Sequence, residues 1–474
     1  MSDGLSRKDF LARSAVVAGV LAAPATALAS SRGSFAGTPG KPSSLNVLYA
    51  TVEADADAIK LVLPDLQKDL GIKVNLTTIP YATLQPKVFS ELASKSSHYD
   101  VIIHDVSWMS AITQKVAPLT SYLTNKKLSS SDLALDDFIA KVFYDTVVWN
   151  RKNAHLHFPS DKTINIPAIK AKGFDVLGLP IQSNVLTMSY RKDLFTDPTE
   201  MADYKKQTGK DLAVPVTWDD FASVAKFFTR PDKRMYGTTL MAGAGDWATD
   251  DFKTFLAAFG GDGHLVDDKF NLSFASPEGV KALTFYADLI QKHKVTPPGT
   301  TAASWDTVTQ SFGTGLTAMS MNYHQETLAK NVKGSIGYAL VPKQVGWGPH
   351  FGTWMLSVNQ YGKTPEWAYK AIVWLTGAAQ QKRMLKTQLH PTRTSVYAAA
   401  KTDPSTKAFG NFYDVLGKSL AVGVGRPRLT NYADVDKAIW VAVNNAANGG
   451  DPASELKKQG AQVKSLLKKA GYSA

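Results

Sequence analysis

The chain has 474 residues, of which 44% are hydrophobic, 20% charged and 10% aromatic, and its formal net charge is +12. This composition is that of a folded protein of two or three domains, and it excludes fibrous and disordered classes. The sequence contains no cysteine, which excludes disulfide-stapled domains, thiolate metal sites, cysteine nucleophiles and a cysteine-linked lipid anchor.

Residues 1–29 have the order of a cleaved export signal. The basic stretch Ser6-Arg7-Lys8-Asp9-Phe10-Leu11 precedes an apolar run over residues 15–28, with small residues near its end. Residues 6–11 resemble a twin-arginine signal in which Lys8 replaces the second arginine. Because the run is rich in alanine and shorter than the roughly 20 apolar residues of a spanning helix, we expect a soluble periplasmic protein without a lipid anchor.

Strand-like and helix-like segments alternate after a linker rich in Ser, Gly and Pro at residues 30–44. The predicted elements are strands at 45–50, 74–78 and 101–103 and helices at 59–70 and 84–92. This βαβαβ order predicts a parallel sheet covered on both faces, with ligands bound beyond the carboxyl ends of its strands.

Helices dominate later in the chain. Ser276-Pro277-Glu278 is a predicted helix start, with Ser276 as N-cap, and a second helix is expected at 367–378. Strand-like runs at 317–321, 337–341 and 354–358 predict a domain that is completed by separate segments. Residues 457–469 are rich in lysine but carry a helical apolar stripe, so they are interpreted as a solvated amphipathic helix and not as a nucleic-acid site.

Motifs for catalysis and cofactors are mostly missing from the sequence. It has no His-Glu-x-x-His zinc motif and no Gly-x-Ser-x-Gly nucleophile elbow. Residues 243–248 match a dinucleotide fingerprint loosely, but they are better explained as a glycine turn before a helix whose N-terminus faces a cleft. His155 and His157 have metal-ligand spacing without a third ligand, and we interpret them as surface residues. The sequence therefore predicts no metal, no cofactor and no enzymatic activity.

Aromatic residues recur beside polar ones in turn-like segments. Trp108 follows Asp105 by three residues, Trp247 follows Asp246, and Trp305 precedes Asp306. The other aromatic residues in such surroundings are Tyr323, Trp347 and Trp354. Aromatic faces stack on the apolar faces of sugar rings while neighbouring polar groups bond the hydroxyls, so the pattern favours a carbohydrate site.

Short motifs in a fixed order extend over essentially the whole mature chain. They are Tyr99-Asp100-Val101-Ile102-Ile103, Pro118-Leu119 with Tyr122, Gly178-Leu179-Pro180, residues 188–195, residues 215–221, Phe259-Gly260-Gly261, residues 276–280, Phe312 with Gly315 and Ala318-Met319, and the helix at 368–376. Together they resemble the extracellular solute-binding proteins of ATP-driven importers, in the sugar-binding branch that includes maltose-binding protein.

The resemblance implies a periplasmic-binding-protein type II-like α/β fold, with two lobes joined by crossing hinge strands and a ligand cleft between them. Crossings are placed near 188–191, 317–321 and 352–356, so that lobe one holds 45–189 plus 322–351 and lobe two holds 190–321 plus 352–474. The implied function is capture of a carbohydrate by hinge closure. The expected partners are that solute and the permease subunits of the importer, with no nucleic acid, and the protein is expected to be a monomer.

Candidate ligand-binding residues follow from these crossings. They are Glu53, Asp105, Trp108, Asp246, Trp247, Trp305, Tyr323, Trp354 and Arg393. Asp105 and Trp108 come just after the third predicted strand, where the switch-point rule puts ligands. Arg393 is either a forked donor to the solute or part of an ion pair within or between the lobes. Two alternatives stay open: a periplasmic carbohydrate-active enzyme, and a binding protein for a phosphorylated polyol, if basic groups prevail in the cleft, or a polyamine, if paired carboxylates do.

Overall fold

The structure is a computed structural model that describes residues 40–51, 53–128, 130, 133–159, 161–323, 332 and 334–472, apart from the side chains of 53–55 and 82. The predicted export signal and most of the predicted linker lie outside these ranges. Within them, no helix combines the length and the apolar character that crossing a membrane requires.

A five-stranded sheet with the order β2-β1-β3-β10-β6 organises the first lobe. Its strands are β1 (Ser44–Thr51), β2 (Lys73–Pro80), β3 (Val101–Asp105), β6 (Leu179–Val185) and β10 (Phe351–Val358). β1 pairs in parallel with β2 and β3, whereas β10 runs antiparallel between β3 and β6. Every residue of β3 is buried, as expected for a sheet that is covered on both faces. The predicted parallel βαβαβ start is confirmed.

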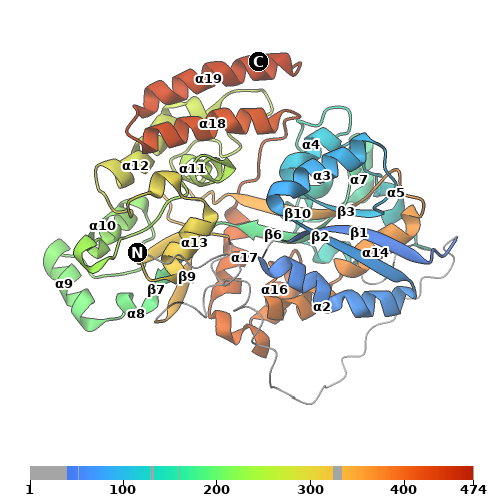
Figure 1. Cartoon of the computed structure of the whole chain (residues 1–474), viewed down its shortest axis with the longest axis horizontal. Coiled ribbons are helices and arrows are strands. Elements are labelled where there is room, and N and C mark those ends of the chain that lie inside the picture. Colours follow the sequence, from blue (N-terminus) through green and yellow to red (C-terminus); the bar gives the residue numbers. More distant parts are fainter. Residues whose placement is uncertain are drawn as a thin grey trace, which may run out of the picture. The chain divides into compact units, whose positions relative to one another are not determined.

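Helices cover both faces of this sheet. α2 (Glu53–Leu70) connects β1 to β2, and α3 (Tyr81–Ala93) connects β2 to β3 in the opposite direction across the sheet. Right-handed crossovers of opposite direction place their helices on opposite faces, and Figure 1 shows α3 above the sheet and α2 below it. α14 (Pro365–Leu375) packs on α2 and β10, and α6 (Ala140–Val147) packs on β6 and β10.

The other elements of this half are short or peripheral. They are the 3-10 turn η1 (Val106–Trp108), α4 (Met109–Ile112), α5 (Thr120–Leu123), η3 (Leu135–Asp137), the two-stranded pair β4 (Val148–Trp149) and β5 (Asp175–Val176), α7 (Ile166–Ala171), α15 (Ala378–Met384), η8 (Leu385–Thr387), α16 (Thr394–Ala400) and η9 (Pro404–Phe409). α17 (Phe412–Val422) packs on β6 and also on two strands of the second lobe.

The second lobe contains a three-stranded antiparallel sheet, β8 (Met319–Asn322), β7 (Thr187–Arg191) and β9 (Ile336–Ala339), in that order. Its helical elements are α8 (Lys192–Phe195), α9 (Pro198–Thr208), α10 (Trp218–Phe228), η4 (Pro231–Lys233), α11 (Asp246–Ala258), η5 (Ser273–Ala275), α12 (Pro277–Gln291), η6 (Thr300–Ala302), α13 (Trp305–Gly313), α18 (Tyr432–Ala447) and α19 (Pro452–Lys469). α18 packs against α11, α12 and α19. Figure 1 shows α18 and α19 side by side.

Two helix predictions for this lobe are confirmed. The Ser276 side chain caps α12 by accepting a hydrogen bond from the Gly279 backbone N–H at 3.2 Å, with Pro277 in the first turn. In α19, Leu456, Val463 and Leu467 are buried while the lysines lie on the other side. The C-terminal helix therefore uses its apolar stripe to pack on the lobe.

Two main hydrophobic cores correct the predicted division of the chain. One core joins apolar residues of 45–181 with those of 354–389, and the other joins 186–341 with 429–467. Residues 354–389 thus pack with the first lobe, and Tyr323 and Val341 pack in the second, the reverse of the sequence-based assignment. The reason is β10, which completes the first sheet by antiparallel pairing with strands far away in sequence.

The chain passes between these cores at three places. The passages are residues 182–186, from the end of β6 to β7, residues 342–353, before and within β10, and residues 421–428, from the end of α17 towards α18. The predicted crossings at 188–191 and 352–356 lie close to two of them. The prediction at 317–321 is wrong because Ala318, Met319 and Met321 are buried within the second core, and the third passage was not predicted.

Candidate functional site

A cavity of about 280 Å³ lies where the two lobes meet. Its lining residues are Tyr81, Gln85, Ser107 and Trp108 from the first lobe, Arg426 from the third passage, and Asp246, Tyr432, Ala433, Asp436 and Trp440 from the second lobe. Tyr81 directly follows β2, and Ser107 and Trp108 follow β3. The cavity therefore adjoins the carboxyl ends of parallel strands, as the switch-point rule predicts.

Five aromatic rings form one continuous cluster at this cavity. The Tyr81 ring centroid lies 5.8 Å from that of Trp108 and 5.7 Å from that of Trp354, both in the first lobe. The same ring lies 5.9 Å from Trp305 in the second lobe, which in turn contacts Trp247 at 5.0 Å. Tyr81 thus joins the aromatic residues of the two lobes.

Arg426 joins the lobes through charge. Its guanidinium donates to Asp105 Oδ1 at 3.2 Å in the first lobe, to Asp250 Oδ2 at 2.7 Å in the second, and to His350 Nε2 at 3.1 Å. Burial alone would lower the pKa of Arg426, but the charges of Asp250 and Asp105 outweigh burial and hold its pKa above the ordinary value. Arg426 therefore stays protonated and pairs with one carboxylate from each lobe.

Two further carboxylates face the cavity. Burial first, and then the charge of Asp250, raises the pKa of Asp246 to about 6. Burial, and then the charge of Asp246, raises the pKa of Asp436 to about 8. Asp246 accepts a long hydrogen bond of 3.5 Å from Tyr81 Oη, and Asp436 accepts one of 3.3 Å from Tyr432 Oη.

A polar layer behind the cavity fixes the position of Arg426. Tyr323 Oη donates to Asp250 Oδ2 at 3.3 Å and is also hydrogen-bonded to His350. The buried Lys253 ammonium donates to the carbonyl of Val424 at 2.9 Å and to that of Gly425, which precedes Arg426. These contacts hold the third passage against α11, so Tyr323 is a positioning residue and not part of the lining.

The structure brings most of the predicted binding residues together. Trp108 and Asp246 line the cavity, and Asp105 lies behind it as a partner of Arg426. Trp108 also belongs to the aromatic cluster, together with three further predicted tryptophans, Trp247, Trp305 and Trp354. Glu53 begins α2, but its side chain lies outside the described part of the structure.

Arg393 is a correction, because it lies inside the first lobe and not at the cavity. It is fully buried; its guanidinium donates to the carbonyls of Thr376, Ala134 and Leu133, the last two at 3.0 Å, and it forms an ion pair with Asp137 at 3.7 Å. The same group lies over the Phe138 ring, 3.8 Å from its centroid. Arg393 thus ties separate segments of one core together, in agreement with the alternative of an ion pair within a lobe.

Several cavity residues were missed by the sequence analysis. They are Tyr81, Gln85, Ser107, Arg426, Tyr432, Ala433, Asp436 and Trp440. The rule applied to Asp105 would also have found Tyr81, because Tyr81 stands at the carboxyl end of a neighbouring parallel strand. No local motif marks Arg426 or Asp436, since their segment reaches the cavity only through the unpredicted third passage.

The glycine turn and the two histidines have structural roles. Residues 238–241 form no strand, and the turn leads into α11, whose first residue, Asp246, lines the cavity. His157 is not freely exposed: its Nδ1 lies 2.6 Å from Asp268 Oδ1 of the second lobe, and the His155 ring contacts Phe270. Across the described ranges, no group of three or more His, Asp or Glu side chains could hold a metal ion.

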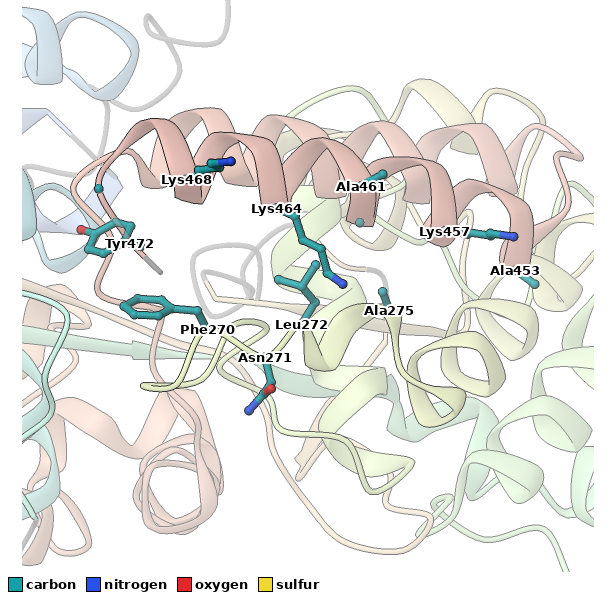
Figure 2. Close-up of a pocket in the computed structure, with 12 residues that line it drawn as sticks. Phe270, Asn271, Leu272, Ala275, Ala453, Lys457, Ala461, Lys464, Lys468 and Tyr472 are labelled. Atoms are coloured by element: carbon teal, nitrogen blue, oxygen red, sulfur yellow. The ribbon is translucent and has the colours of Figure 1, made fainter. Parts of the chain in front are cut away.

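A second hollow of about 1300 Å³ runs along α19. Figure 2 shows Lys457, Lys464 and Lys468 on the helix above Leu272, with Phe270 and Tyr472 at one end. As far as the structure describes it, its lining contains neither a carboxylate nor a tryptophan. The smaller cavity therefore has the better chemistry for a hydroxylated solute.

Residues 49–382 match the profile of the bacterial extracellular solute-binding protein family. The chain belongs to this family. Among curated proteins, this solute-binding protein is similar to a "Probable ABC transporter-binding protein" of Deinococcus radiodurans, with 24% identity over 70% of this chain and 71% of that protein. It is also similar to a "Probable amino-acid ABC transporter periplasmic-binding protein" of Sinorhizobium fredii, with 24% identity over 89% of each chain.

Solved structures show the same fold. Maltose-bound MalE3 of T. maritima matches with a TM-score of 0.71 and 23% identity, covering 90% of this chain and 100% of that one. A ribitol-bound binding protein from Agrobacterium radiobacter matches with a TM-score of 0.69 and 24% identity, and the match covers 89% of this chain and 98% of that one. A mannitol-bound binding protein from Agrobacterium vitis matches with a TM-score of 0.69 and 22% identity, and the match covers 91% of this chain and 100% of that one. The predicted two-lobed α/β architecture of this solute-binding protein is thereby confirmed.

Proposed function

We propose that this solute-binding protein is the periplasmic receptor of an ABC importer and captures a small carbohydrate or polyol between its lobes. The observation that carries the proposal is the cavity of about 280 Å³ with aromatic and charged side chains from both lobes. That volume suits one monosaccharide-sized solute and lies near the lower end of ordinary ligand pockets. Similar proteins bound to maltose, ribitol and mannitol support this class.

Hinge closure is the proposed mechanism. A solute in this cavity contacts Trp108 of the first lobe and Asp246 of the second at once, and only a closed arrangement offers both contacts. A ligand shifts a conformational equilibrium by its differential affinity for the two states, so the solute stabilises the closed form. Permease subunits would then recognise the loaded protein.

The chemistry of the cavity separates this proposal from its alternatives. A phosphorylated polyol needs free cations, but among the described lining residues Arg426 is the single cation, and it already pairs with Asp105 and Asp250. A glycoside-cleaving enzyme would release products from oligosaccharides, and incubation with such substrates tests that alternative directly. We expect no product.

A thermal-shift screen over sugars, polyols, sugar phosphates and polyamines tests the proposed class, because a ligand of the folded state raises the melting temperature. For the strongest compound, Trp108→Ala and Trp247→Ala should each weaken binding about tenfold or more. Trp347→Ala is the matched control, because Trp347 is 38% exposed and lies outside both the cavity lining and the five-ring aromatic cluster to which Trp108 and Trp247 belong. Equal affinity of all three variants and the unmodified protein would rule out the aromatic site.

A further inference from the structure

The cation in the cavity wall is already neutralised by the protein. All three nitrogens of the Arg426 guanidinium donate to protein acceptors: Nη1 to Asp105, Nη2 to Asp250, and Nε to the imidazole of His350. The negative charges of Asp105 and Asp250 therefore balance the positive charge of Arg426 before any solute enters. Arg426 has little unmatched charge to offer an anionic ligand.

The carboxylates of Asp246 and Asp436, in contrast, have no positively charged partner among the described residues. Both line the cavity, and in the described part of the chain neither forms an ion pair with a lysine, arginine or histidine. Asp436 is only 6% exposed, and its carboxylate accepts a hydrogen bond from a neutral phenol, Tyr432. Buried carboxylates without a cation are costly, and the raised pKa values of both groups express that cost. The cavity is therefore short of positive charge.

Aromatic rings line the same space. Tyr81, Trp108 and Trp440 line the cavity together with the two carboxylates. Rings of this kind attract an organic cation through their negative faces, and the attraction grows when the cation is removed from water. A metal ion would be a poorer occupant, because the described residues offer no set of three or more His, Asp or Glu ligands.

We propose that the captured solute is a hydroxylated amine, such as an amino polyol or an aminosugar, whose ammonium group lies between Asp246 and Asp436 within the aromatic wall. This inference rests on the proposed function and narrows its solute class. The ammonium supplies the positive charge that the wall lacks, while Gln85 and Ser107, which also line the cavity, remain for hydroxyl groups. The proposed preference over the corresponding neutral polyol comes from the carboxylates.

Isothermal titration calorimetry with a matched pair tests the inference on the intact chain. The probes are D-glucitol and 1-amino-1-deoxy-D-glucitol, which differ by one hydroxyl replaced by an amine. We expect the amine to bind at least about tenfold more tightly at pH 7. Asp436→Asn should remove most of that preference, whereas Asp434→Asn, the same substitution at an exposed position of the same helix, should leave it intact.

A second measurement on the unmodified protein guards against a misfolded Asp436→Asn variant. The Asp436 carboxyl has a pKa of about 8 without solute, so pairing with an ammonium at pH 7 must release a proton. Asp246, Asp250 and Arg426 are the charged groups that act on it. Titrations in two buffers of different ionisation enthalpy should show this proton release for the amine and none for D-glucitol.

The outcomes separate this inference from the proposed function. If D-glucitol binds as tightly as its amine, or if the amine releases no proton, the inference is overturned while the proposed function stands. If 1,4-diaminobutane binds and neither hydroxylated probe does, the carbohydrate class is overturned and so is a hydroxylated amine. If none of the three binds at millimolar concentration, both proposals fail.

Discussion

Two buried arginines in the last third of the chain have different structural roles: Arg393 connects segments within one lobe, whereas Arg426 connects the two lobes. Arg393 donates mainly to backbone carbonyls of one core, and its ion-pair partner, Asp137, belongs to that core. Arg426 donates to side chains from both lobes and lines the cavity. Each has a proline close by in sequence, Pro391 two residues before Arg393 and Pro427 directly after Arg426, so the sequence alone does not distinguish them. The difference lies in whether the partners of the guanidinium belong to one core or to two.

The largest expected effect is that of Arg393→Met on stability. The change leaves the carbonyls of Leu133, Ala134 and Thr376 without their buried donor, and breaking such a network costs roughly 3–5 kcal/mol of unfolding free energy. Urea denaturation measures the loss. Arg383→Met is the control, because its pair with Asp65 is exposed and worth at most about 1 kcal/mol. If solute affinity falls and stability does not, Arg393 belongs to the binding site after all.

Arg426→Met should cost less stability, because the freed carboxylates of Asp105 and Asp250 can be hydrated from the adjoining cavity. Its characteristic effect is on the coupling between lobes. A double-mutant cycle with Asp105→Asn should give a coupling free energy of about 1–3 kcal/mol. We also expect a larger radius of gyration for the Arg426→Met protein by small-angle scattering. If the two substitutions have additive effects on the unfolding free energy, the contact between Arg426 and Asp105 does not stabilise the arrangement of the lobes, and this part of the account is wrong.

Asp436→Asn should change the pH dependence of stability. The folded-state pKa of about 8 lies above that of an unfolded aspartate, so the folded protein holds the proton that the unfolded chain loses. This group therefore favours the folded state below about pH 4, and its contribution is lost as the pH rises towards 8. The difference in unfolding free energy between the variant and the unmodified protein should therefore depend on pH. It should be more favourable to the variant at pH 8 than at pH 5, by roughly 1–3 kcal/mol. Parallel melting-temperature profiles from pH 5 to pH 8 would contradict the assignment.

The smallest expected effect comes from the contact between the lobes away from the cavity. His157→Gln removes the 2.6 Å contact with Asp268, a half-exposed partner, and should cost no more than about 1 kcal/mol. Solute affinity should change by less than about twofold, in contrast to Arg426→Met. Chemical denaturation and calorimetry on the two variants side by side give both values.

Local spacing was enough to predict the first part of the fold. The βαβαβ start follows from apolar periodicity between residues 45 and 103, and the caps of α12 and the stripe of α19 follow from residues within one or two turns. The lobe assignment of later segments failed, because β10 reaches its place by pairing with β3 and β6. Pairing between strands that are distant in sequence leaves no local pattern.

The site was predictable to the extent that strand ends mark it. Asp105 and Trp108 were found because Asp105 ends β3 and Trp108 follows that strand, and Asp246 because a glycine turn precedes it. Arg426 lies in the third passage, before α18, and Asp436 lies in α18; no motif marks either residue, and only this passage between the lobes brings them to the cavity. Arg393 was misplaced as a solute contact because its residue type does not reveal which of two buried environments it occupies.

A crystal structure of the protein with the tightest compound from the thermal-shift screen is the most direct measurement of where the solute binds. We predict ligand density in the cavity of about 280 Å³, in contact with Tyr81, Trp108 and Asp246. Density in the groove along α19 instead, beside Lys464 and Leu272, would contradict the assignment of the cavity between the lobes as the binding site.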